Sequence, residues 1–304
     1  MLQLPIEIHN EIVFHFVWDR PIRRPRPKPR WRDIEPLSLV CRAFRRMVLE
    51  AWFHTLCICR RQDLSIVSQY WPELPQWVRV FVCLHNLLVD YDDEWDLARF
   101  VNLREVVVQM LPFWDVIPFP CLANVPPSVT KLDMTGMGEI GPTDLEAIVK
   151  PFPNLRVLRL QPYSTWCGLC NTFTSSSFSC PVPSSLTYEG GVGLPAHFAQ
   201  FLQPLEDLET LYITAKYDLL SDEEANPLLE IGEENKTMWS GECRDCMQRL
   251  YPDDSFREDW VAKKKTPAIH LPALKRVEWI FLSGDAFANE TGDKSHFRPN
   301  PLHL

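Results

Sequence analysis

A pattern of apolar positions written Φ-x-x-Φ-x-Φ, where Φ is an apolar residue and x is any residue, recurs along most of the chain. Successive copies begin 25, 26, 26, 31, 22 and 66 residues apart. Three consecutive steps of 25–26 residues are hard to obtain by chance, so the pattern predicts repeats in which each copy supplies one strand of a parallel sheet. The copies begin at Val78, Leu103, Val129, Leu155, Leu208 and Leu274, with a degenerate copy at Leu186.

The segments between the copies contain signals for short helices that would return the chain to the next strand. Residues 143–146 match a capping box ahead of apolar residues at helical spacing. A second short helix is predicted in 195–205. Because each strand–helix unit can bury its apolar face only against its neighbours, we expect residues 63–304 to form one irregular stack of units.

Residues 1–62 carry apolar residues at helical spacing instead. Ile8, Ile12 and Phe16 share one face of a predicted first helix, and a second helix is predicted over 35–56. The apolar positions of the first helix cover more than one stripe, and two or three short helices bury little area by themselves. We therefore expect another polypeptide to cover part of this unit.

Two segments of this N-terminal unit resemble the F-box, the module that docks on a Skp-type adaptor in cullin–RING ubiquitin ligases. The segments are Leu4-Pro5-x-Glu7-Ile8 with Ile12, and Leu39-Val40-Cys41-Arg42-x-Phe44. They cover a small part of the chain, and a basic, proline-rich insertion at 20–33, which a standard F-box lacks, separates them. The resemblance implies an adaptor-binding set made of Leu4, Pro5, Ile8, Ile12, Leu39, Val40, Cys41 and Phe44.

Residues 63–304 resemble degenerate leucine-rich repeats, because the step of 25–26 residues lies within the range of that family. Together the two resemblances are typical of a fungal F-box protein, a non-catalytic substrate-recognition subunit of a Skp–cullin–F-box ubiquitin ligase. The implied fold class is an α+β or α/β solenoid, with a small helical F-box followed by an irregular parallel sheet and short helices. The F-box would hold the adaptor and its cullin complex, and the repeats would hold a target protein. On the exposed face of the sheet, the expected target-binding residues are Arg104, Lys131, Arg156, Arg159 and Tyr212.

Charge is unevenly distributed along the chain, whose net charge is −9. Residues 1–61 carry a net charge of +6, and the remainder carries −15. An acidic body of this kind argues against nucleic-acid binding through the overall field of the protein. The basic insertion at 20–33 has no Pro-x-x-Pro spacing, and we interpret it as an extended, solvated loop.

Ten cysteines occur in a chain without a recognisable secretory signal, which favours free thiols or metal ligands over a disulfide framework. No apolar run reaches the ~18 residues that a membrane span needs. We therefore expect a cytoplasmic or nuclear protein that makes no membrane contact.

Two of the cysteine pairs have the spacing of metal ligands. Cys167 and Cys170 form one C-x-x-C pair, and Cys243 and Cys246 form another. Two such pairs are what a tetrahedral Cys₄ zinc site needs, and no other cofactor is implied. Both pairs lie in long segments between strands, a Ser/Pro-rich loop at 161–185 and an acidic insertion at 216–267. We expect these segments to leave one sheet edge two strands apart, ~10 Å, so that a structural zinc ion could join them.

The motifs for catalysis are weak or absent. Residues 136–141 read GMGEIG and match a dinucleotide-binding fingerprint, but Pro142 interrupts the helix that should follow, and the next strand ends without an acidic residue for a ribose. No G-x-S-x-G, P-loop or H-E-x-x-H motif occurs. We therefore expect no catalytic activity in the chain itself.

Two other functions remain open on the sequence. One is an interaction scaffold that uses the repeats and a structural zinc site but never joins a ligase. The other is a nucleic-acid binder that uses the basic insertion and the zinc loops, against which the net charge of −15 beyond residue 61 counts.

Overall fold

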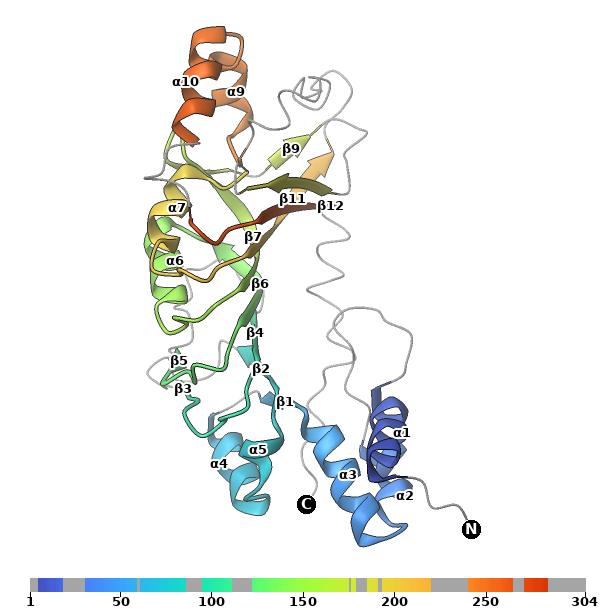
Figure 1. The fold of residues 1–304 in the computed structure, drawn as a ribbon. Coiled ribbons are helices and arrows are strands. Elements are labelled where there is room, and N and C mark those ends of the chain that lie inside the picture. Colours follow the sequence, from blue (N-terminus) through green and yellow to red (C-terminus); the bar gives the residue numbers. More distant parts are fainter. Residues whose placement is uncertain are drawn as a thin grey trace.

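The computed structural model describes residues 5–18, 31–58, 61–85, 95–110, 122–174, 176–178, 185–190, 193–219, 240–264 and 271–283. Within them, three N-terminal helices precede a large, mostly parallel sheet with further helices beside it (Figure 1). The helices are α1 (Ile6–Trp18), α2 (Trp31–Ser38), α3 (Arg42–Phe53), α4 (Arg61–Tyr70), α5 (Leu74–Trp77), α6 (Pro142–Val149), α7 (Ala196–Leu202), α9 (Arg244–Leu250) and α10 (Asp254–Lys264). The strands are β1 (Thr55–Ile58), β2 (Val80–His85), β3 (Trp95–Asp96), β4 (Glu105–Met110), β5 (Leu122–Ala123), β6 (Lys131–Glu139), β7 (Val157–Cys167), β8 (Thr172–Thr174), β9 (Ser176–Phe178), β10 (Ser185–Glu189), β11 (Thr210–Leu219) and β12 (Arg276–Ser283).

The main sheet runs in the order β1-β2-β4-β6-β7-β11-β12-β10, with β8 paired to β7 and β9 paired to β11. Neighbours from β1 to β12 along this path are all parallel, whereas β10 is antiparallel to β12. A mixed α/β fold with a mostly parallel sheet is therefore confirmed. The repeated pattern explains its register, because the middle apolar residue of each copy pairs with that of the next. These residues, in strand order, are Leu56, Phe81, Val106, Leu132, Leu158, Leu211 and Val277.

The first of these strands belongs to a copy that sequence analysis missed. Phe53, Leu56 and Ile58 follow the same pattern 25 residues before Val78, and all three are buried in the core of the sheet domain. The predicted second helix ran through them to Leu56, but α3 ends at Phe53. The sheet therefore begins at Thr55, inside the N-terminal unit predicted over 1–62.

Backbone hydrogen bonds repeat at the start of each strand. The carbonyl of His54 accepts from the amides of Arg79 and Val80, and the carbonyl of Arg79 accepts from the amides of Arg104 and Glu105. The same double acceptor recurs along the stack, so successive copies are held in one register. The further acceptors are the carbonyls of Arg104, Thr130, Arg156 and Glu209.

Polar side chains just before the strands add a second link between copies. Asn102 Nδ2 donates to the carbonyl of Gln76 at 3.0 Å, and Ser128 Oγ donates to that of Val101 at 3.1 Å. Asn154 Nδ2 continues the series by donating to the carbonyl of Pro127 at 2.9 Å. Each donor reaches back 26 or 27 residues. We call Asn102, Ser128 and Asn154 the polar ladder.

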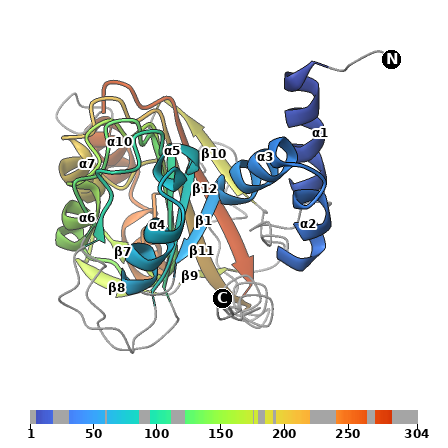
Figure 2. The same ribbon diagram turned by 90° about the horizontal axis from the view of Figure 1, so that it is seen from below.

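One continuous core extends from Phe53 to Phe281, on the face of the sheet that α6 and α7 cover. Leu145 of α6 and Phe198 of α7 are buried in it. Viewed from below, α6 and α7 lie on one side of the strands and α1–α3 on the other (Figure 2).

The three N-terminal helices enclose a separate, small core. Trp18 Nε1 donates to the carbonyl of Ala51 at 2.8 Å and ties α1 to α3. Trp52 of α3 packs against both this core and the larger one, so α3 joins the helical unit to the sheet. The buried apolar residues of the small core are Val13, Val17, Trp18, Ile34, Met47, Val48 and Ala51.

Several predicted boundaries were wrong. The single helix expected over 35–56 is two helices, broken at 39–41, where amides of Leu39 and Val40 bond to carbonyls three residues back and close α2. Both helices face the same small core, which is why their apolar periodicity runs on across the break. Residues 31–33, assigned to the extended insertion, are the first turn of α2, and the rest of that insertion, 20–30, lies outside the described residues.

The degenerate copy at Leu186 was also wrong, because β10 is an antiparallel edge strand. The expected loops at 161–185 and 216–267 contain ordered elements in their described parts: β7 extends to Cys167, β11 extends to Leu219, and α9 and α10 follow.

Residues 136–141 are not a phosphate-binding loop. Gly136 and Gly138 lie inside β6, where the pairing with β7 shifts between Met134 and Met137. Gly136 has φ 69, a conformation that glycine adopts without the cost of a Cβ, so the glycines serve a bulge in the strand. The helix that follows is capped by Gly141, whose amide donates to Asp144 at 2.8 Å, and not by the predicted Thr143.

Candidate functional site

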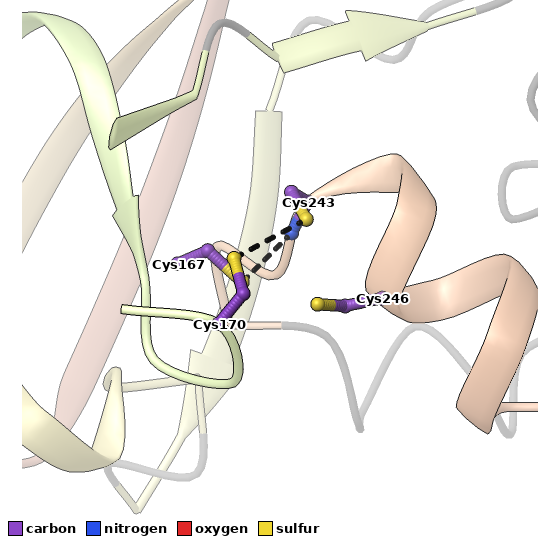
Figure 3. A group of neighbouring side chains, drawn as sticks. All are labelled: Cys167, Cys170, Cys243 and Cys246. Atoms are coloured by element: carbon purple, nitrogen blue, oxygen red, sulfur yellow. Dashed lines mark hydrogen bonds between the residues drawn. The ribbon is translucent and has the colours of Figure 1, made fainter. Parts of the chain in front are cut away.

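Four cysteine thiols converge beside the sheet (Figure 3). The Sγ atoms of Cys167, Cys170, Cys243 and Cys246 all lie within 4.8 Å of one another. Those of Cys170 and Cys243 are 3.8 Å apart. Zinc–sulfur bonds of ~2.3 Å in a tetrahedron place the sulfurs ~3.8 Å from one another. The prediction that the two C-x-x-C pairs meet is therefore confirmed, at a spacing that suits one tetrahedral ion.

The first pair is held by the hairpin of β7 and β8. Cys167 is the last residue of β7 and pairs with Thr172 of β8. Between them, the amide of Asn171 donates to the carbonyl of Cys167 at 2.9 Å, and Asn171 has φ 56, a conformation that asparagine tolerates better than most residues. This tight turn brings Cys170 back beside Cys167.

The second pair lies at the start of α9. Cys243 caps the helix, and Cys246 lies in its first turn, so the spacing of three residues places both thiols on one side. The amide of Cys243 also donates to the Sγ atom of Cys167 at 3.3 Å. The two pairs are thus in direct contact across 76 residues of sequence.

Gly241 sets the path of the chain into the second pair. Its φ is 93, and a Cβ there would lie 2.9 Å from the ring of Trp279 and 3.0 Å from Thr165. Only glycine combines this conformation with so close an approach to β7 and β12. The segment that carries Cys243 is therefore seated on the sheet itself.

Glu242 ties the same segment to α10. Its buried carboxylate accepts hydrogen bonds from the amide and hydroxyl of Ser240 and, at 3.0 Å, from Trp260 Nε1. A buried carboxylate is stable in a protein when it is hydrogen-bonded in this way. The cysteine loop and α10 therefore form one packed unit.

Burial and mutual proximity set the ionisation of the thiols. Burial alone would raise the pKa of Cys170, but hydrogen bonds with Thr172 and the neighbouring thiols lower it to about 7. Burial raises the pKa of Cys243 to about 11, and it raises the pKa of Cys246 further still. Four adjacent thiols cannot all ionise without a cation among them, and a divalent metal would supply that charge.

The predicted positions of the two cysteine-bearing segments, 161–185 and 216–267, need one correction. They were placed two strands apart, but β7 and β11 are direct neighbours in the sheet. The extra strand was the copy assigned to Leu186, which lies instead beyond β12.

The residues expected to bind an adaptor lie mostly on an open surface. Ile8 and Ile12 of α1 are exposed, as are Leu39 and Val40 at the α2–α3 turn. Phe44 is half-buried and makes an edge contact with the ring of His9 at 5.8 Å. Pro5 and Cys41 are exposed, and Leu4 lies outside the described residues.

Three more apolar side chains of α1 are exposed and were not in the predicted set: Ile6, Phe14 and Phe16. The sequence indicated their exposure only through the number of apolar positions in α1, which exceeds what one buried stripe needs. We call Ile8, Ile12, Phe16, Leu39 and Val40 the apolar face of the helical unit.

The residues expected to bind a target lie on or beside the strands. Arg104, Lys131 and Arg156 are exposed at the starts of β4, β6 and β7. The guanidinium of Arg159 lies 4.4 Å from the centre of the Tyr212 ring, so these two side chains stack on each other across neighbouring strands.

No protein-family model matches the chain, and no curated protein matches it. Among the helices that the structure describes, none has the length and apolar character to cross a membrane.

Proposed function

We propose that the chain is a substrate-recognition subunit of a Skp–cullin–F-box ubiquitin ligase. Its N-terminal helices dock on a Skp-type adaptor, and its sheet domain holds a target protein. Ubiquitin transfer takes place on other subunits, and this chain contributes by holding the target close to them.

One observation carries the proposal: the helical unit has a closed core and, outside it, an uncovered apolar face. Val40 is 65% exposed and Ile12 is 53% exposed, and monomers rarely expose large contiguous apolar patches. The chain's own sheet domain does not cover these residues. Exposed apolar clusters of this kind mark sites where another protein binds.

The sheet domain fits the second half of the proposal. Seven copies of one apolar pattern pair in one register, and the strands step along the stack as leucine-rich repeats do. We propose that it is a short, irregular solenoid of this kind. Stacks of this type present an extended sheet face that is suited to binding another protein.

The four cysteines fit a structural zinc ion better than a catalytic one. All four would be protein ligands, which leaves no position open for a substrate or water. The ion would join the β7–β8 hairpin to the start of α9 and so fasten a long insertion to the sheet.

The adaptor contact is tested by capture on a purified Skp-type adaptor. Val40 and Val101 make a matched pair, because they are 65% and 62% exposed but lie on the helical unit and on the sheet domain, respectively. We expect Val40→Asp to abolish capture and Val101→Asp to leave it unchanged.

Equal capture of both variants would contradict the proposed contact. A folded wild-type protein that never binds the adaptor would favour the interaction scaffold outside any ligase. Binding to DNA or RNA that weakens steeply with salt would favour the nucleic-acid binder.

A further inference from the structure

Four cations follow one another across three neighbouring strands of the sheet. Arg104 precedes β4, Lys131 begins β6, and Arg156 and Arg159 lie at the start of β7. The amide of Lys131 donates to the carbonyl of Arg104, and Val157, next to Arg156, pairs with Lys131. Strands ~4.8 Å apart place the backbone positions of Arg104 and Arg156 ~10 Å apart, with Lys131 on the strand between them and Arg159 three residues further along β7. We call these four residues the basic strip.

The strip differs from the adjoining part of the same face, where the charges are paired. Just before β11 and β12, Lys275 bonds to Glu209 at 3.0 Å, and within β12 Arg276 bonds to Glu278 at 2.6 Å. In the described part of the chain, Arg104 and Lys131 have no carboxylate within 4.0 Å.

Arg156, just before β7, and Arg159 within it make only weak contacts with other side chains. Arg156 reaches Glu209 at 4.0 Å, and Lys275 already holds that carboxylate. Arg159 rests on Tyr212, a contact that leaves the edge of its guanidinium free to donate. The strip therefore offers four cations, in a part of the chain whose net charge is −15.

Charge complementarity identifies the kind of partner that fits. We infer that the basic strip binds an acidic, extended segment of the target protein, an inference that rests on the proposed function. The ~10 Å between Arg104 and Arg156 matches three residues of extended peptide at ~3.3 Å each. Carboxylates on such a segment can accept from the guanidinium groups and the ammonium of Lys131.

The acidic residues Glu105 and Asp133 favour a peptide over a nucleic acid as the ligand of the basic strip. In the backbone register of the sheet, Glu105 lies opposite Lys131 and Asp133 lies opposite Arg159. Acidic residues therefore alternate with basic ones on this face. A nucleic acid places a phosphate at every step and meets these carboxylates with repulsion. A peptide can place neutral or basic residues opposite them.

Fluorescence anisotropy with the full chain tests the inference, using a short fluorescein-labelled glutamate-rich peptide as the probe. We expect wild type to bind it more tightly than the same peptide with glutamine in place of glutamate, and binding to weaken as salt is added. Arg104→Glu/Lys131→Glu should lower the affinity about tenfold or more. The matched control is Arg99→Glu/Lys150→Glu, which changes the net charge equally at exposed positions in a turn and at the end of α6. It should bind as wild type does.

Equal loss in both double variants, or equal binding of the glutamate and glutamine peptides, would overturn the inference. So would tighter binding of a single-stranded DNA of the same charge. The adaptor capture described above does not use the sheet, so Arg104→Glu/Lys131→Glu should still be captured. If the adaptor captures the chain but the peptide does not bind, the inference fails and the ligase proposal stands. If the peptide binds but the adaptor does not capture the chain, the ligase proposal fails.

Discussion

Ile12 and Val13 are neighbours in α1 that face opposite environments: Ile12 is 53% exposed and Val13 is 1% exposed. Val13 is buried among α2 and α3, whereas Ile12 belongs to the apolar face. Two adjacent residues of α1 thus separate the core of the helical unit from its exposed apolar face.

This difference predicts opposite results for the same substitution. Val13→Ser should lower the free energy of unfolding by about 2–4 kcal/mol, because it opens a cavity and buries a hydroxyl. Ile12→Ser should change it by less than about 0.5 kcal/mol. Urea unfolding followed by circular dichroism measures both, and a large loss in Ile12→Ser would show that this side chain is already covered.

Metal content gives the second prediction. Purified protein should contain one zinc ion per chain, and Cys246→Ser should contain none, since three thiols and a hydroxyl hold zinc poorly. A strong chelator should lower the unfolding temperature of wild type, because metal binding contributes to folding. Cys41→Ser, which changes an exposed thiol elsewhere, is the control and should retain the metal.

The zinc hypothesis would be wrong if mass spectrometry under native conditions found a metal-free chain that unfolds at the same temperature with and without the chelator. Zinc retained in Cys246→Ser at wild-type stoichiometry would show that the ion lies elsewhere.

The polar ladder gives the third prediction. Asn154→Ala should lower the free energy of unfolding by about 1 kcal/mol, because the carbonyl of Pro127 loses its donor. Asn154→Ser should lose less, since Ser128 fills the equivalent position with a hydroxyl. Similar losses in the two variants would show that the hydrogen bond itself contributes little.

Protonation of His54 gives the fourth prediction. Its ring makes edge contacts with Phe14 at 5.4 Å and Trp18 at 6.4 Å, where α1 meets the end of α3. Burial, and after it the charge of Arg79, lowers the pKa of His54 below its usual value. The unfolded chain therefore takes up this proton first as the pH falls, so the stabilisation is complete above ~6.5 and declines below it.

NMR titration of the His54 ring should give a pKa below 6.5 in wild type and a higher one in Arg79→Ala. In unfolding experiments at different pH values, His54→Gln should reduce the loss of stability on acidification. An ordinary histidine pKa in the folded protein would contradict the packing of α1 on this residue.

The sequence predicted those features that depend on a repeated local pattern. The apolar positions of the copy at Leu155 recur in both neighbouring strands, so the pattern predicted the parallel sheet. The C-x-x-C spacing of Cys167 and Cys170 predicted a pair of metal ligands. The copy at Phe53 was missed because apolar residues at helical spacing lead directly into it.

Other features depend on contacts distant in sequence. The place of β10 is set by its antiparallel pairing with β12, a strand distant in sequence, and nothing local distinguishes Leu186 from a parallel repeat. The close approach of Gly241 to Trp279 shows only in three dimensions. The polar ladder is invisible in the sequence because Asn154 bonds to a carbonyl 27 residues back in the chain.

The central claim is that a Skp-type adaptor completes the apolar face of the helical unit, and calorimetric titration of the chain with such an adaptor tests it most directly. We predict saturable binding of one adaptor per chain, with a negative heat-capacity change from apolar burial that Ile12→Ser and Val40→Asp both diminish. No heat of binding at any temperature, or binding that neither substitution alters, would contradict it.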